Sequence, residues 1–245
     1  MKTVKISALA LAMMGVFATS ANAQSAKANA WEGAYGQIGV GWGMFNPTVS
    51  NGTAVQPTGL PAPYPSSVNL NSSASNVNNV STGLVNLAVG YNFGISPNYV
   101  LGLAATYYPG ASSGATGNLN YYTQSGALAK TSPASYQVKN LYSIVLTPGY
   151  VIDKDRLAYA KIGYTGATIG LSTPDLAYNT NNLSGYTLGL GYKQIITGSI
   201  FAFGEVNYAA YGNKTANGTT TSGAAISNQI KGTGTDILVG LGYRF

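Results

Sequence analysis

The last stretch of the 245-residue chain constrains its fold more than any other. Side chains in an extended strand alternate between two faces, so residues 235–245 separate into two sets. One face carries the apolar residues Ile237, Val239, Leu241, Tyr243 and Phe245, and the other carries Asp236, Leu238, Gly240, Gly242 and Arg244. A strand with apolar residues toward lipid and small or polar residues toward a lumen is the unit of a transmembrane β-barrel. We therefore expect the preceding residues to build the rest of a barrel.

Residues 1–23 have the pattern of a secretory signal peptide. Two lysines precede a short apolar segment, and an Ala-Asn-Ala cleavage site ends at Ala23, with a weaker one ending at Ala30. The apolar segment is too short to cross a membrane as a helix. The expected domains are this leader, a periplasmic lead-in over residues 24–33, and one barrel domain over residues 34–245.

The amino-acid composition argues against several classes of function. Charged residues make up 7% of the chain, against about 25% in a typical soluble domain. Loss of the leader removes two lysines, so 10 basic and 6 acidic residues remain and the net charge falls from +6 to +4. This small excess gives no reason to expect nucleic-acid binding. Cysteine is absent, which excludes disulfides and thiolate metal sites, and we expect no cofactor.

Alternation of apolar residues predicts an all-β chain, an eight-stranded antiparallel up-and-down transmembrane β-barrel. The predicted strands cover residues 34–45, 83–93, 99–108, 136–152, 157–168, 183–195, 200–211 and 235–245. Short turns alternate with long polar loops, which indicates periplasmic turns and extracellular loops. If the loop over residues 46–82 holds a hairpin with arms at 67–71 and 76–80, the count becomes ten.

Four sequence pieces carry a family resemblance: Tyr159-Ala160-Lys161-Ile162-Gly163-Tyr164, Gly185-Tyr186-Thr187-Leu188-Gly189-Leu190-Gly191-Tyr192, Phe203-Gly204-Glu205-Val206-Asn207-Tyr208 and Gly240-Leu241-Gly242-Tyr243-Arg244-Phe245. With them the chain resembles the small outer-membrane barrels of the OmpA-like transmembrane superfamily. The resemblance implies a place in the bacterial outer membrane among its lipids and lipopolysaccharide. It also implies periplasmic chaperones and the barrel assembly machinery as partners, with Tyr243 and Phe245 in the C-terminal insertion signal. We expect no counterpart of the peptidoglycan-binding domain of full-length OmpA.

Enzymatic chemistry is not expected. The small outer-membrane barrels that are enzymes resemble one another in using an active-site histidine, and this chain contains no histidine. A Ser-His or Asp-His arrangement is therefore excluded. Asp153 and Asp155 are close in sequence, but they lie in a predicted turn beside Lys154 and Arg156, where solvated carboxylates are the ordinary interpretation.

The charges predicted to face the lumen are the candidate functional residues. The strand pattern turns Lys161, Lys193, Glu205 and Arg244 inward. Because an unpaired buried charge is unfavourable, we expect Glu205 to pair with Lys161, and Arg244 or Lys193 to share it. Such pairs either plug the barrel or, by exchanging partners, gate a narrow pore. Lys139 and Asp236 are expected at the extracellular rim of the lumen.

Two functions remain in view. The first is a non-enzymatic, surface-exposed structural protein whose loops act in adhesion, with host or phage surfaces as ligands. The second is a narrow porin-like channel for small solutes or apolar ligands, as in the OmpW-like barrels that the chain also resembles. A soluble secreted β-sandwich is the third alternative, and it requires Val85, Leu87, Ile237 and Leu241 to be buried against a second sheet.

Overall fold

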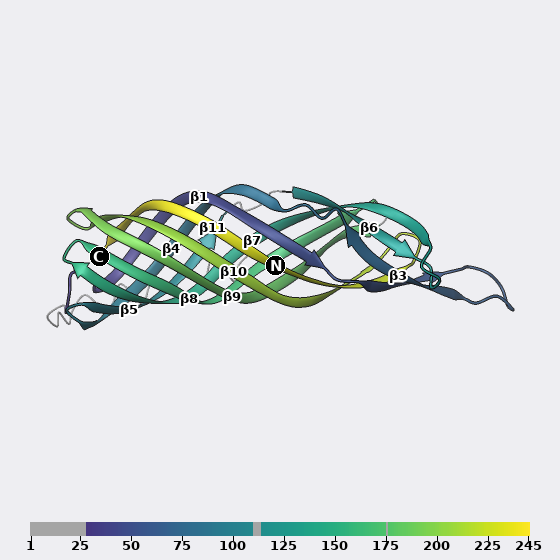
Figure 1. Ribbon diagram of the computed structural model, residues 1–245, viewed down its shortest axis with the longest axis horizontal. Helices are drawn as coiled ribbons and strands as arrows, with labels where there is room; N and C mark the ends of the chain where they lie inside the picture. Colours follow the sequence, from purple (N-terminus) through teal and green to yellow (C-terminus); the bar gives the residue numbers. More distant parts are fainter. Residues whose placement is uncertain (1–27, 110–113, 175) are drawn as a thin grey trace.

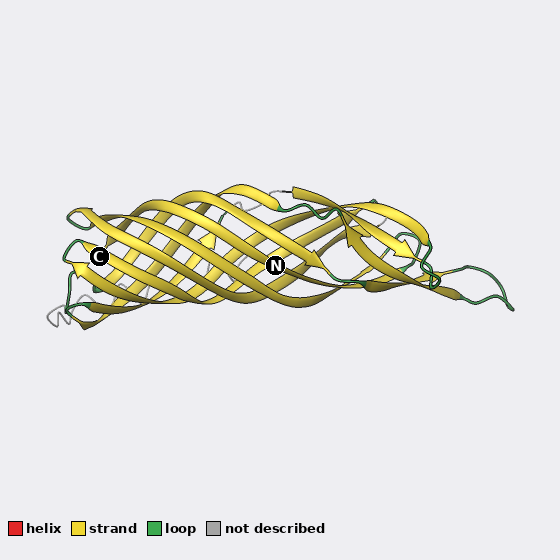
Figure 2. Cartoon of the chain, in the orientation of Figure 1, coloured by secondary structure: helices red, strands yellow, loops and turns green. Residues whose placement is uncertain are grey.

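A computed structural model describes residues 28–109, 114–174 and 176–245; the predicted signal peptide lies outside these residues. Within them the secondary structure is strand and turn (Figure 2), and no helix is long and apolar enough to cross a membrane. The strands are β1 (Gly33–Val49), β2 (Gly52–Pro57), β3 (Ser67–Ser75), β4 (Val80–Ser96), β5 (Tyr99–Tyr108), β6 (Gly114–Tyr122), β7 (Leu128–Asp153), β8 (Arg156–Thr173), β9 (Leu176–Thr197), β10 (Ile200–Thr219) and β11 (Ala225–Arg244).

The strands form one antiparallel sheet that closes on itself. The pairing runs from β1 through β4, β5, β7, β8, β9 and β10 to β11, and β11 pairs with β1 again. Figure 1 shows the result as a long barrel with tight turns at one end, where the C-terminus also lies. We call this the turn end. The opposite end, where Figure 1 labels β3 and β6, is the distal end.

The wall continues at the distal end through a second set of pairings. There β2, β3 and β6 bridge β11 and β7, so they occupy the part of the wall that β1, β4 and β5 form nearer the turn end. The strands β1 and β2 are separated by residues 50–51, and β3 and β4 by residues 76–79. Strands β7 to β11 run through both parts without such a break. The barrel is therefore two stacked rings that share five strands.

The sequence located the strands better than it counted them. Every predicted strand lies within an observed one, apart from Phe245, and β5 has the predicted bounds. The described residues form eleven strands, against the eight or ten predicted, because the predicted loops 46–82 and 109–135 contain β2, β3 and β6 in addition to the eight predicted strands. The hairpin alternative is also wrong in its pairing, since β3 pairs with β2 and β6 and not with residues 76–80. Asn76 ends β3 in a left-handed conformation (φ 51°), which asparagine tolerates.

The outer face of the barrel carries large apolar side chains. Val85, Leu87, Ile237 and Leu241 are each 40–59% exposed, so the β-sandwich alternative is wrong. The exposed apolar set also includes Ile38, Val40, Trp42, Leu103, Ile144, Leu146, Ile162, Leu188, Leu190, Val206 and Val239. In a barrel of this kind, an outward apolar belt is the surface that contacts lipid.

A bulge in β7 reverses which side chains face inward. The register with β8 shifts between Lys139 and Tyr142, and Asn140 between them has a positive φ of 51°. Val138 is therefore buried, although simple alternation predicts it outward, and Lys139 lies opposite Thr168 on the outer face. The predicted place of Lys139 at the rim of the lumen is wrong, because the extra residue flips the alternation.

Candidate functional site

The turn end of the lumen is closed by the residues that precede β1. The side chain of Trp31 is only 2% exposed and packs edge-on against Phe201, with ring centroids 5.8 Å apart. Its backbone carbonyl accepts a hydrogen bond from the Asn92 side chain at 2.9 Å, and its backbone N–H donates to Asn29 Oδ1 at 3.0 Å. The described part of the predicted lead-in, residues 28–32, therefore closes the mouth of the barrel. We call these residues the stopper.

Arg244 fastens this stopper and does not join the charge network. Its guanidinium donates to the carbonyl oxygens of Ala30 and Gly198 and lies 5.3 Å from the Trp31 ring centroid. The prediction that Arg244 shares Glu205 is therefore wrong. Arg244 is the last residue of β11 and lies at the mouth of the barrel. Its planar guanidinium therefore donates to backbone carbonyls there and does not reach Glu205.

Glu205 is the centre of a buried polar cluster above the stopper. Its carboxylate is 2.7 Å from Lys161 Nζ, and it accepts hydrogen bonds from Tyr159 Oη at 2.6 Å and Gln37 Nε2 at 3.2 Å. Both charged side chains of the pair are 6% exposed or less. The predicted pairing of Glu205 with Lys161 is present, and the sequence did not identify the neutral donors Tyr159 and Gln37.

Lys193 lies one layer nearer the turn end. Its side chain is 3% exposed, and Nζ stands 3.5 Å from the centroid of the Tyr35 ring. The Tyr159 and Phe201 rings are 5.0 and 5.1 Å away. In the sheet, Lys193 lies opposite Phe203 and Glu205 lies opposite Gly191, so Lys193 and Glu205 are two residues out of register. The ammonium group of Lys193 therefore contacts aromatic faces and not the carboxylate.

Asp236 lies inside the lumen, deeper than the rim position predicted for it. It is opposite Asn207 in the sheet and accepts a hydrogen bond from the Asn207 side chain at 2.8 Å. Asn207 also contacts Glu205, at 3.4 Å, and thereby links the two carboxylates into one polar layer. We call the set Gln37, Tyr159, Lys161, Glu205, Asn207 and Asp236 the polar plug.

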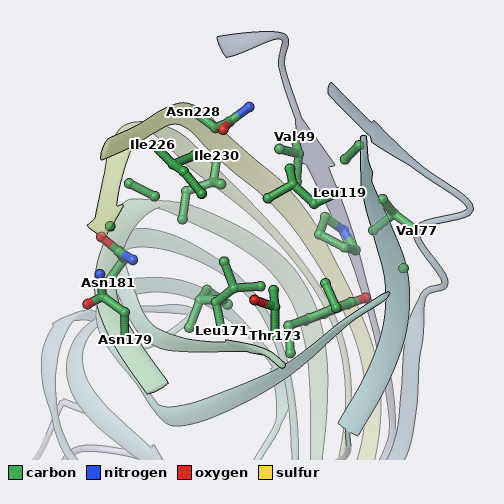
Figure 3. A pocket seen from close by; sticks show the side chains of 18 of the residues that line it. Val49, Val77, Leu119, Leu171, Thr173, Asn179, Asn181, Ile226, Asn228 and Ile230 are labelled. Carbon is green, nitrogen blue, oxygen red and sulfur yellow. The ribbon is translucent and has the colours of Figure 1, made fainter. Parts of the chain in front are cut away.

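Beyond the polar plug the lumen changes character and becomes an apolar pocket. An apolar cluster that includes Phe45, Tyr136, Val138, Ile169 and Leu183 spans the barrel there. Between this cluster and a second one at the distal end, the pocket encloses about 990 Å³, counting the part that opens to solvent. Its lining includes Val49, Val77, Leu119, Leu171, Ile226 and Ile230, with several asparagines among them. In Figure 3 side chains from different sides of the wall, such as Leu171 and Ile230, point into this common space.

The sequence analysis missed this distal pocket. Its lining comes largely from segments predicted to be loops, including Val77, Leu119 and Ile226. A signal was present, because Ile226, Asn228 and Ile230 recur at period two within residues 225–230. The polar residues Ser227, Asn228 and Gln229 resemble loop composition, and they conceal the alternation.

The charged turn at residues 153–156 holds a surface ion pair. The Asp153 carboxylate is 2.6 Å from the Arg156 guanidinium, and both side chains are solvent-exposed. The backbone N–H of Asp155, together with Arg156, stabilises the charged carboxylate and lowers the pKa of Asp153. In the part of the chain that the structure describes, no three acidic residues form a group that could hold a metal ion.

Comparisons with known proteins bear on the fold. No protein-family model matches the chain, and no curated protein matches it in sequence. The solved structure of the outer membrane protein OprG from Pseudomonas aeruginosa is similar, with a TM-score of 0.50 and 12% identity over 89% of this chain and 99% of OprG. Two others have lower scores. The outer membrane protease OmpT from Escherichia coli has a TM-score of 0.45 and 12% identity over 85% of this chain and 97% of OmpT. The attachment invasion locus protein Ail from Yersinia pestis has a TM-score of 0.39 and 9% identity over 83% of this chain and 99% of Ail.

The class of protein follows from the closed antiparallel sheet, the outward apolar belt and the likeness to OprG. The chain has the fold of the bacterial outer-membrane β-barrels, and its expected location, the outer membrane, agrees with that fold. At 12% identity the likeness concerns the fold alone.

Proposed function

We propose that this chain is a non-enzymatic outer-membrane barrel that holds a small apolar molecule in its distal pocket, outside the cell. The ring of β1, β4, β5 and β7 to β11 forms eight membrane-spanning segments in this proposal, with the tight turns in the periplasm and the distal ring extracellular. The apolar belt supports the membrane-spanning part of this proposal, because it lies on these eight strands.

The observation that carries the proposal is the apolar pocket itself. It is a concave space lined mainly by aliphatic side chains, the kind of surface on which small apolar ligands bind. The aliphatic side chains that surround it come from β1, β6, β8, β9 and β11, so no single strand or loop forms the pocket. An apolar surface of this kind removes a ligand from water with a favourable free energy proportional to the area buried.

A pair of neighbouring substitutions tests the proposal. Ala134 lines the pocket, whereas Ser135 next to it is exposed on the outer face, so Ala134→Trp fills the pocket and Ser135→Trp serves as the matched control. The refolded chain in lipid nanodiscs is titrated with the uncharged fluorescent probe N-phenyl-1-naphthylamine, with empty nanodiscs as the blank. Saturable binding that is lost in Ala134→Trp and kept in Ser135→Trp supports the proposal. Equal binding by both variants would overturn it.

The narrow channel is less well supported, because the stopper and the polar plug fill the lumen between the pocket and the turn end. We expect the purified protein to give no steady openings in a planar bilayer. Steady conductance that changes in Lys161→Met would favour the channel and a gating role for the Glu205–Lys161 pair.

Adhesion stays as a second candidate because of one exposed feature. The hairpin that joins β2 to β3 protrudes beyond the barrel (Figure 1), and its Leu60 and Tyr64 side chains are 53% and 62% exposed. Residues 46–82 contain no charged side chain. Cells that display the chain with Leu60→Ser and Tyr64→Ser should attach less well to a host surface than cells displaying the unchanged chain. Equal attachment would remove the hairpin from consideration.

A further inference from the structure

The lining of the distal pocket is neutral as well as apolar. Among its described residues only Lys231 carries a charge. Lys231 lies opposite Thr48 on the outer face of β11, where its side chain is exposed, while Asn228 and Gly232, which alternate with it along the strand, are buried. A charged group inside the pocket would therefore meet no opposite charge from the described lining, and it would lose its hydration without compensation.

The polar plug does not supply that charge either. Asp236, the described carboxylate on its distal side, is already hydrogen-bonded to Asn207. The apolar cluster that contains Phe45, Tyr136 and Leu183 separates this layer from the pocket. A cationic ligand in the pocket would therefore lie away from the carboxylates of the lumen.

Apart from the hydroxyl groups of Thr173 and Tyr136, the neutral polar side chains that line the pocket are carboxamides, and those of Asn228 and Asn179 are hydrogen-bonded. Asn228 accepts from Ser72 Oγ at 2.9 Å and donates to the Ser50 carbonyl at 3.1 Å. Asn179 donates to the carbonyl of Asn217 at 2.6 Å. The carboxamide of Asn181 has no hydrogen bond to any residue that the structure describes. Figure 3 shows Asn181 at the edge of the pocket beside Asn179, across from the aliphatic side chains.

From this arrangement we infer that the distal pocket takes an uncharged amphiphile, whose apolar body lies among Leu171, Ile226 and Ile230 and whose single hydroxyl, amide or carbonyl group bonds to Asn181. This inference rests on the proposed function and specifies its ligand. A primary amide both donates and accepts, so it can serve each of these neutral groups. Charged amphiphiles of the same chain length are excluded by the cost of stripping water from the ion.

The experiment uses displacement of N-phenyl-1-naphthylamine from the chain in nanodiscs. The competitors share one alkyl chain and differ in the head group: decanol, decyl sulfate and decyltrimethylammonium, each corrected for uptake by empty nanodiscs. We expect decanol to displace the probe at a concentration at least about tenfold lower than either ion. Displacement by an ion at the same concentration as decanol would overturn the inference.

Two variants on β9 locate the head group. Asn181→Leu should weaken decanol binding roughly fivefold, the size of one hydrogen bond, relative to the affinity for the probe titrated in the same variant. The matched control is Asn182→Leu, because Asn182 is exposed on the other face and should leave both affinities unchanged. Unchanged decanol affinity in Asn181→Leu would overturn the assignment. This failure differs from that of the proposed function, in which the probe does not bind the pocket at all.

Discussion

The two halves of the lumen are opposites, although the same five strands run through both. Near the turn end the interior is filled by Trp31, by aromatic rings and by the polar plug around Glu205. Near the distal end the interior is an apolar pocket that opens to solvent. A membrane-spanning ring must satisfy its buried polar groups internally, whereas a ring outside the bilayer is free to leave space. Under the proposed function, the plug contributes stability and the pocket binds the ligand.

The largest expected effect comes from breaking the plug at its ion pair. Glu205→Leu leaves Lys161 buried without its carboxylate, and the free energy of unfolding should fall by about 3–5 kcal/mol. Urea unfolding followed by the heat-modifiable mobility of the barrel on gels measures this loss. The double variant Glu205→Leu with Lys161→Met should recover most of it. If both variants were equally unstable, the pairing would not be the cause.

The stopper gives the next effect, and the chain provides its own control. Trp31→Ala removes a fully buried ring and should lower the free energy of unfolding by roughly 3 kcal/mol. Trp42→Ala removes a ring that is 59% exposed on the outer face and should have a clearly smaller effect in the same urea titration. Equal losses would contradict a stopper inside the lumen. Probe binding in the distal pocket should be unchanged in both variants.

One substitution near the polar plug is expected to increase the free energy of unfolding, by less than the decreases above. Asn86 is fully buried, and neither atom of its carboxamide has a hydrogen-bond partner among the described residues. Asn86→Leu should raise the free energy of unfolding by about 1 kcal/mol, because it removes an unsatisfied polar group beside Phe203. A destabilised Asn86→Leu variant would indicate that the carboxamide is satisfied in solution.

The smallest effect lies outside both halves, in the charged turn. Because the folded-state pKa of Asp153 is lowered, its contribution to stability is present above the ordinary aspartate pKa and disappears as the pH falls through the folded value. Asp153→Asn should therefore be slightly less stable than the unchanged chain at neutral pH and indistinguishable from it in acid. Unfolding titrations at the two pH values measure this. A difference that persists in acid would contradict the assignment.

The turn-end half was predictable from the sequence, and the distal half was not. Apolar residues such as Val85 and Leu87 alternate cleanly where the outer face meets lipid, and this fixed the strands and the inward direction of Lys161 and Glu205. Outside the belt there is no lipid to require large apolar residues, so β2, β3 and β6 carry loop-like composition. The alternation predicts which face a side chain is on but not its height along the barrel axis, so the predicted positions of Arg244 and Asp236 were wrong. The bulge at Asn140 misplaced Lys139, because one extra residue leaves no mark on composition.

The breaks between the stacked rings also affect how the sequence can change. A residue inserted within a continuous strand such as β9 shifts every partner beyond it and turns each following side chain to the other face. An insertion at residues 50–51 or 76–79 falls between strands, so the partners of β1 and β4 in the turn-end ring keep their register. The strands β2 and β3 of the distal ring can therefore change in length and in the residues that line the lumen, while the strands of the turn-end ring keep their pairing.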